Sequence, residues 1–241
     1  MRRECDAGLW GIENERNSEG GFAGTQNISV SVDHRETKGE KLMGNWPEEE
    51  NFDRAVKALE RAEEKASYWF WPPGMDIVPE GAGAFAVNKP VTDGHVQQMI
   101  DVGVFCQGII NYIRRFNGKK VPYDPNFRNP NYDGGTWANQ RYFADFIRPF
   151  RQYVEIPRGA LIGRYFRWAG APGFSAVKDQ GHVGVLLRAQ DLKNQQDGLL
   201  LHSHPAVGGL NRTRLGASHA NGYYDYWIHP RDWINHDKGK F

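Results

Sequence analysis

A cysteine at position 106 stands directly before an apolar repeat that predicts a helix. In "CQGIINYIRRFNG" the apolar residues recur at helical spacing, at Ile109, Ile110 and Ile113. The unpaired N–H groups and the dipole of a helix N-terminus stabilise a thiolate, which is the nucleophilic form of cysteine, and the same N–H groups can receive an oxyanion. Gly108 would let another segment or a substrate come close. The alternative is a buried structural cysteine, a common setting for this residue.

Three histidines follow in strand-like runs. His182 opens "HVGVLL", where the alternation of a strand puts it on one face with Gly184, so its imidazole is placed to meet a helix end as a general base. His202 and His204 fall in "GLLLHSHP" and share one face. For each of them an ordinary polar residue at a strand end is the alternative.

The string "HSHP" also resembles the zinc-binding motif of JAMM-type metal-dependent isopeptidases. Two histidines at that spacing bind the metal together with an acidic residue, and the fourth position is left open for water. In that family a Ser and then an Asp follow at fixed spacing, but here those positions fall on Arg212 and Leu215, and the next acidic residue is Asp225. Because the acidic ligand is missing, we expect no metal ion and keep a zinc isopeptidase only as an alternative.

Several strings together resemble the NlpC family of cell-wall cysteine peptidases. "FCQGIINYIRRFNG" resembles the family's D-C-S-G-L-V-x-Y-V-Y motif, "PRGALIGRYF" its P-G-D-L-V-F-F strand, "GHVGVLL" its H-V-G-I-Y strand and "LLLHS" its V-I-H-A strand. "KASYWFWPPG" corresponds to the P-Y-x-W-G-G segment ahead of the cysteine. The resemblance covers roughly residues 50–230. It departs from the family at Phe105 and Gln107, which flank the cysteine in place of Asp and Ser, and at Ala160, which replaces the aspartate of "GDL".

This resemblance implies a papain-like α+β fold and hydrolysis of a peptide bond. It implies that Cys106 is the nucleophile, His182 the general base, and His202 the residue that orients the imidazole. The substrate site is expected to include three further residues, His204, Tyr68 and Gln107. The expected substrate is the peptide stem or cross-link of bacterial peptidoglycan, and neither a metal nor a cofactor is expected.

Helices are predicted first in the chain and strands later. "PEEENFDRAVKALERAEEKASYW" predicts a helix over residues 47–69, because apolar residues fall on one face and Pro47 with three glutamates suits an N-terminus. Further helices are predicted from Cys106 and over residues 138–155. Strands are predicted in "GALIGRYFRW", "GHVGVLLRA", "GLLLHSHP" and "YYDYWIHPRDW". This order predicts an α+β fold with helices packed on an antiparallel sheet.

The domain organisation predicted is an N-terminal extension followed by one catalytic domain. Residues 1–46 are polar and Gly-rich, with one possible strand in "NISVSVD". Residues 47–241 form the predicted papain-like domain, with insertions near 72–100 and 119–150.

The composition of the 241 residues excludes several classes of protein. The net charge is +1, which gives no reason to expect binding to nucleic acid, and the two cysteines are too few for a disulfide scaffold. No apolar run approaches the roughly 20 residues of a membrane span, and no secretory signal is visible. The localisation and the oligomeric state therefore stay open, and an export route or a phage-borne role would bring the protein to the cell wall.

Two other functions are compatible with the same sequence. A Cys–His pair also serves acyltransferases and thioesterases, since a fold does not fix the acyl acceptor. The aromatic strings "YWFW" and "YYDYW" could bind a glycan or a protein on a peptidase fold without catalysis, although such clusters more often belong to a core.

Overall fold

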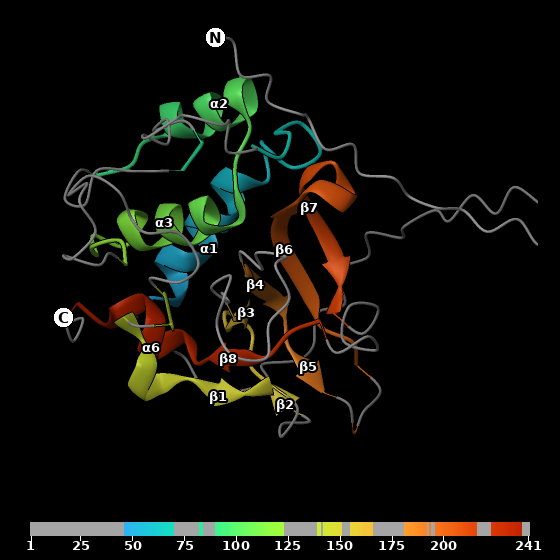
Figure 1. Ribbon diagram of the computed structural model, residues 1–241. Coiled ribbons are helices and arrows are strands. Elements are labelled where there is room, and N and C mark those ends of the chain that lie inside the picture. Colours follow the sequence, from blue (N-terminus) through green and yellow to red (C-terminus); the bar gives the residue numbers. More distant parts are fainter. Residues whose placement is uncertain are drawn as a thin grey trace, which may run out of the picture. The chain divides into compact units, whose positions relative to one another are not determined.

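The computed structural model has an α+β fold in which helices pack against an antiparallel sheet, as predicted (Figure 1). All described residues lie in the unit Lys41–Phe241. The predicted extension, apart from Trp46, and the "NISVSVD" strand lie outside them. The structure describes residues 46–69, 82–83, 90–122, 139–140, 142–150, 155–165, 181–191, 193, 196–215 and 223–237.

The main sheet has six strands, and every neighbouring pair is antiparallel. Its strands in spatial order are β1 (Arg148–Pro149), β8 (Tyr226–Ile228), β3 (Leu161–Arg164), β4 (His182–Arg188), β6 (Leu199–His204) and β7 (Gly209–Arg214). A separate pair is formed by β2 (Glu155–Ile156) and β5 (Gln190–Asp191). The α-helices described over their full length are α1 (Glu49–Leu59), α2 (Asp93–Val102), α3 (Cys106–Phe116) and α6 (Pro230–Asn235). Figure 1 shows α1, α2 and α3 gathered on one side of this sheet.

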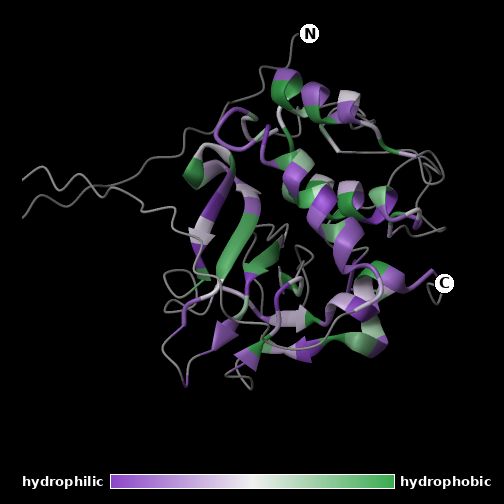
Figure 2. Ribbon diagram, turned by 180° about the vertical axis from the view of Figure 1, so that it is seen from behind, coloured by the Kyte–Doolittle hydropathy of each residue, from purple (hydrophilic) through white to green (hydrophobic). Residues whose placement is uncertain are grey.

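The two faces of the sheet belong to different hydrophobic clusters. The helix-side cluster contains residues of α1 and α3, among them Phe52, Ile109 and Ile113. It also contains strand residues that face these helices, among them Leu161, Val183, Val185 and Leu201. The second cluster lies on the opposite face and includes Phe150, Ile162, Leu186, Leu200, Tyr224 and Trp227. Figure 2 shows hydrophobic and hydrophilic residues alternating along the three helices, as expected when one face of each helix is buried.

Helix α1 has the predicted apolar face but is shorter than predicted. The residues of that face are all buried: Phe52, Ala55, Val56, Leu59, Ala62 and Ala66. After Leu59 the chain continues as a series of turns, in which the N–H of Glu64 donates to the carbonyl of Leu210 on β7 (2.9 Å). Arg212 of β7 also pairs with Glu63 at 2.5 Å. These contacts with β7 replace the helical bonds that the sequence pattern alone favoured.

Helix α3 begins at Cys106, as predicted, and ends at Phe116. Gly108 permits the close approach expected of it, because a Cβ added there would lie 2.7 Å from the carbonyl oxygen of Ala82 and 2.9 Å from the Cα of Gly83. The segment Ala82–Gly83 therefore packs directly on the first turn of α3.

The predicted helix over residues 138–155 is present only at its start, where residues 139, 140 and 142 are helical and the N–H of Phe143 donates to the carbonyl of Asn139 (2.9 Å). The rest of its described part contains a short 3₁₀ helix, η2 (Ala144–Phe146), and then the edge strand β1, which pairs with β8. Pro149 lies within β1, a position that a proline tolerates at the edge of a sheet.

Helices α2 and α6 and strand β7 are among the elements that were not predicted, and α6 begins at Pro230, inside the predicted strand "YYDYWIHPRDW". Helix α2 lies at the end of the region 72–100, where the N–H of Thr92 donates to Nδ1 of His95 (2.9 Å) and so satisfies the start of the helix. Strand β7 follows β6 after the short helix η4 (Pro205–Val207), and it turns back at Gly208 and Gly209, both with positive φ. In the part of the chain that the structure describes, no helix has the length and apolar character needed to cross a membrane.

Candidate functional site

The antiparallel pairing of β4 and β6 brings His182 and His202 together. Nε2 of His182 and Nδ1 of His202 are 2.8 Å apart and share a hydrogen bond, and both side chains are buried. Gly184 makes room for this pair, because a Cβ at that position would lie 2.9 Å from Cβ of His202. Among the described residues none is hydrogen-bonded to Nδ1 of His182, so that nitrogen is the one left for a reacting group.

His204 lies beside this pair without bonding to it. Its ring is 4.9 Å from that of His182, measured between centroids. Nδ1 of His204 accepts the N–H of Ala206 (3.1 Å), which places the ring proton on Nε2, 3.1 Å from the hydroxyl of Tyr223. His204 is therefore fixed in one tautomer at the border of the imidazole pair.

Thr213 of β7 is a further member of the group and was not predicted from the sequence. Its Oγ1 lies 3.0 Å from Nε2 of His202, on the side of that ring away from His182. The signal that would have found it is the "GG" at 208–209, because a Gly-rich turn after "HSHP" predicts a hairpin and therefore a strand through residue 213.

Burial keeps the three imidazoles in their uncharged form at neutral pH. It lowers the pKa of His182 well below its usual value, an effect to which the nearby His202, His204 and Arg164 add. Burial, with a smaller effect of His204, lowers the pKa of His202 to about 4. The pKa of His204 is also lowered, first by burial and then by Arg164. A neutral imidazole is the form that accepts a proton.

Cys106 lies at the N-terminus of α3, buried, and at the end of the sheet where the histidines lie. Ser203, between His202 and His204, donates its hydroxyl proton to the carbonyl of Val104 (2.6 Å), which fastens β6 to the segment just before the cysteine. Along β6 the side chain of Ser203 therefore points toward α3, while those of His202 and His204 point to the other face.

Tyrosines connect the cysteine electrostatically with the histidines. Tyr68 pairs with Val104 in a parallel bridge, and its pKa is raised by burial and by the proximity of Cys106 and Tyr223. The pKa of Tyr224 is raised by burial, by Tyr223 and by Cys106, and the ring of Tyr224 is 6.1 Å from that of His182. Tyr224 thus lies near His182 and within electrostatic range of Cys106.

No family model matches this chain, and neither a curated protein nor a solved structure matches it.

The direction of the side chains restricts how the thiol can reach His182. His182 lies on the face that carries Leu186 of the second cluster, whereas Cys106 belongs to the helix-side cluster. Because His182 is the first residue of β4, a contact between the two groups has to form around the end of that strand and not through the sheet.

Gln107, expected at the substrate site, is fully buried in a network of amides behind the cysteine. Its Nε2 donates to Oδ1 of Asn111 (3.0 Å) and Oδ1 of Asn139 (3.2 Å), and its Oε1 accepts from Nδ2 of Asn139 (2.6 Å). Asn111 in turn donates to the carbonyl of Gly83 (3.0 Å). The network anchors the first turn of α3 to two other segments, and Gln107 has no free amide group to offer a ligand.

No three His, Cys, Asp or Glu side chains of the described residues are arranged to hold a metal ion. The positions at which the isopeptidase motif would place its Ser and Asp hold Arg212, paired with Glu60 and Glu63, and Leu215, buried in the second cluster. Asp225, the next acidic residue along the sequence, accepts the N–H of Tyr165 at 2.9 Å.

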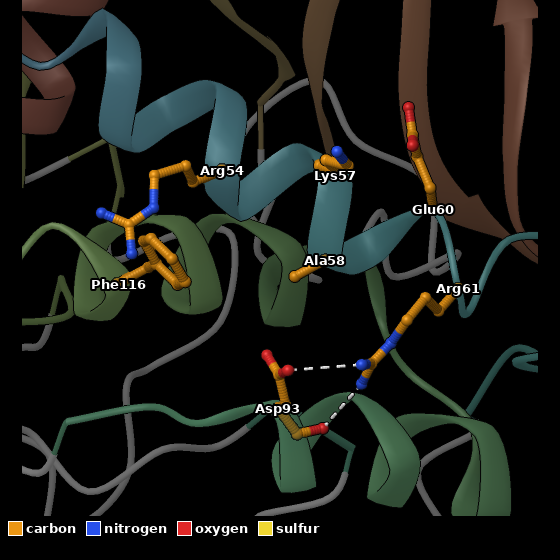
Figure 3. Close-up of a pocket in the computed structure, with 7 residues that line it drawn as sticks. All are labelled: Arg54, Lys57, Ala58, Glu60, Arg61, Asp93 and Phe116. Carbon is orange, nitrogen blue, oxygen red and sulfur yellow. Dashed lines mark hydrogen bonds and ion pairs between the residues drawn. The ribbon is translucent and has the colours of Figure 1, made fainter.

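A separate hollow lies among the helices and shares no described residue with the imidazole group (Figure 3). Arg61 closes one side of it through an ion pair with Asp93 (3.3 Å), and Arg54 lies over the ring of Phe116 at 5.6 Å. Its described lining consists of Arg54, Lys57, Ala58, Glu60, Arg61, Asp93 and Phe116.

Proposed function

We propose that the chain is a cysteine peptidase of papain-like arrangement, with Cys106 as nucleophile, His182 as general base and His202 as the residue that orients it. The observation that carries this proposal is the 2.8 Å hydrogen bond between Nε2 of His182 and Nδ1 of His202, at the end of the sheet where α3 begins with Cys106. That bond commits one nitrogen of His182 and leaves Nδ1 to serve the thiol.

The proposed reaction proceeds in two halves. The proton of the Cys106 thiol passes from Sγ to Nδ1 of His182, and the thiolate attacks the carbonyl carbon of the scissile bond. N–H groups at the start of α3 receive the oxyanion. When the C–N bond breaks, His182 gives its proton to the leaving amine. A water molecule, deprotonated by His182, then hydrolyses the thioester and regenerates the thiol.

The proposed substrate is a peptide of bacterial peptidoglycan, either the stem or the cross-link. Its support is the resemblance of the strings around Cys106, Ala160, His182 and His202 to those of cell-wall peptidases. Burial keeps His182 and His202 uncharged at neutral pH, and an uncharged His182 is the form that can accept the thiol proton.

The experiment uses a Cys5→Ser protein, so that Cys106 is the only thiol. Soluble peptidoglycan fragments are incubated with it, and new amino termini are identified by mass spectrometry. We expect peptide-bond cleavage that stops after reaction with one equivalent of iodoacetamide and persists in EDTA. Cleavage that survives complete alkylation of Cys106, or that a chelator abolishes, would contradict the proposal and favour the zinc isopeptidase.

The two histidines of "HSHP" are expected to differ in their effect on turnover. His202→Ala removes the partner of Nε2 of His182 and is expected to lower kcat by about 10²-fold or more. His204→Ala removes a ring that borders the pair, and its effect is expected to stay below about tenfold. Initial rates of the two variants at saturating peptide measure the difference. Equal losses, or a larger loss in His204→Ala, would show that the wrong histidine has been assigned.

A further inference from the structure

A chain of hydrogen bonds runs across three neighbouring strands. It begins at Nε2 of His182 on β4, passes through Nδ1 and Nε2 of His202 on β6, and ends at Oγ1 of Thr213 on β7, with lengths of 2.8 Å and 3.0 Å. In the strand pairing Asn211 lies opposite His202, and Thr213 reaches the ring as the diagonal neighbour. Oδ1 of Asn211 instead accepts the N–H of Arg212 (2.7 Å).

Once His182 has accepted a proton, the donors and acceptors in this series of hydrogen bonds can be assigned in one way only. A doubly protonated His182 can only donate at Nε2, so Nδ1 of His202 must accept. A neutral His202 then carries its proton on Nε2, and that N–H must be donated to Oγ1 of Thr213. The threonine hydroxyl is therefore the acceptor that terminates the chain.

We propose that Thr213 is a positioning residue that holds His202 with its proton on Nε2 and thereby stabilises the protonated form of His182. The role of this residue in catalysis rests on the proposed function, whereas its hold on the His202 ring does not. A hydroxyl suits the position because it accepts a hydrogen bond without adding a charge, in a place where a carboxylate would itself have to be desolvated.

The charged and titratable groups that face the two imidazoles come from several elements. They are His204 on β6, Arg164 on β3, and Tyr223 and Tyr224 before β8. Arg164 disfavours a positive charge on His182, and His202 and His204 do so as well when they are charged. The chain of hydrogen bonds can therefore stabilise protonated His182 only through a neutral His202 that accepts at Nδ1.

The test compares Thr213→Val with Thr213→Ser in the Cys5→Ser protein. Valine keeps the shape of threonine and its preference for strands but removes the acceptor, whereas serine keeps the hydroxyl. The rate of Cys106 alkylation by iodoacetamide is measured from pH 5 to pH 9. We expect Thr213→Val to lower the rate near pH 7 by about tenfold, the effect of weakening one hydrogen bond to a charged group, and Thr213→Ser to stay within about twofold of the parent. Thr213→Ala supplies the same comparison if valine prevents folding.

Imidazole ¹⁵N chemical shifts give a second measurement that does not depend on the cysteine. At neutral pH we expect His202 to show a protonated Nε2 and an unprotonated Nδ1 in the parent and in Thr213→Ser, and a mixture of tautomers in Thr213→Val. Unchanged shifts and an unchanged alkylation rate in Thr213→Val would overturn the inference. If instead Cys106 of the parent titrates as an ordinary thiol, near pH 8.5, the proposed function fails while the shifts still decide the role of Thr213.

Discussion

Replacing Cys106 with alanine is expected to lower turnover of the peptide substrate by at least about 10⁴-fold, because the nucleophile is lost and only binding and the oxyanion site persist. The fold should survive the change. Cys106 is a small buried residue of the helix-side cluster, and removing its sulfur is expected to lower the free energy of unfolding by about 1 kcal/mol.

The measurement is kcat/KM on the cleaved peptide, together with the far-UV circular dichroism of each variant. Cys106→Ser is expected to be nearly as inactive as Cys106→Ala, because a serine hydroxyl in a site built for a thiolate stays protonated. Cys5→Ser is the matched control and should keep full activity. A pure Cys106→Ala protein that retains more than a tenth of the activity would exclude the mechanism.

Replacing Arg114 with methionine is expected to lower the free energy of unfolding by about 3–5 kcal/mol. The guanidinium is completely buried at the end of α3, and it donates to the carbonyls of Lys120 (2.6 Å), His236 (2.6 Å) and Trp233. Methionine fills a similar volume but leaves these carbonyls without donors, and each unsatisfied group costs about 1–3 kcal/mol.

Two further variants make the Arg114 experiment specific. Arg114→Lys keeps the charge but lacks the planar fork needed to reach several carbonyls, so most of the loss should persist. Arg188→Met is the matched control, because Arg188 is exposed and donates to one backbone carbonyl, that of Asp197, and its loss should stay within about 0.5 kcal/mol. Equilibrium urea unfolding measures all three. A loss for Arg114→Met no larger than that of the control would contradict the role assigned to the buried guanidinium.

The sequence alone was sufficient to predict a helix or strand where its apolar pattern has the period of the element that forms. Ile109, Ile110 and Ile113 predicted α3 and its start at Cys106, and the alternation within each strand predicted that Gly184 shares a face with His182 and that His204 shares one with His202. These features are local, so a single segment carries all the information needed to infer them.

Features that depend on distant contacts were missed. Strand β7 carries "GLNRTR", which has no apolar alternation, because its polar side chains pair with Glu63 and His202 from other segments. The start of α2 was hidden because His95 fills the capping position where a Glu or Gln is usual. Residues 138–155 have a helical pattern, which the start of the segment follows at residues 139, 140 and 142, whereas Arg148 and Pro149 pair with β8 instead.

Strand β6 carries functional side chains on both of its faces, and this limits the insertions and deletions that the site can tolerate. Ser203 fastens the start of α3 on one face, while His202 and His204 serve the imidazole group on the other. Inserting or deleting one residue before this tripeptide would turn the serine toward the histidine side and both histidines toward the helix, so it would disable both faces at once. Deleting two residues keeps the faces and moves His204 to the place of His202. Shortened variants of this hairpin should therefore be inactive after the loss of one residue and partly active after the loss of two.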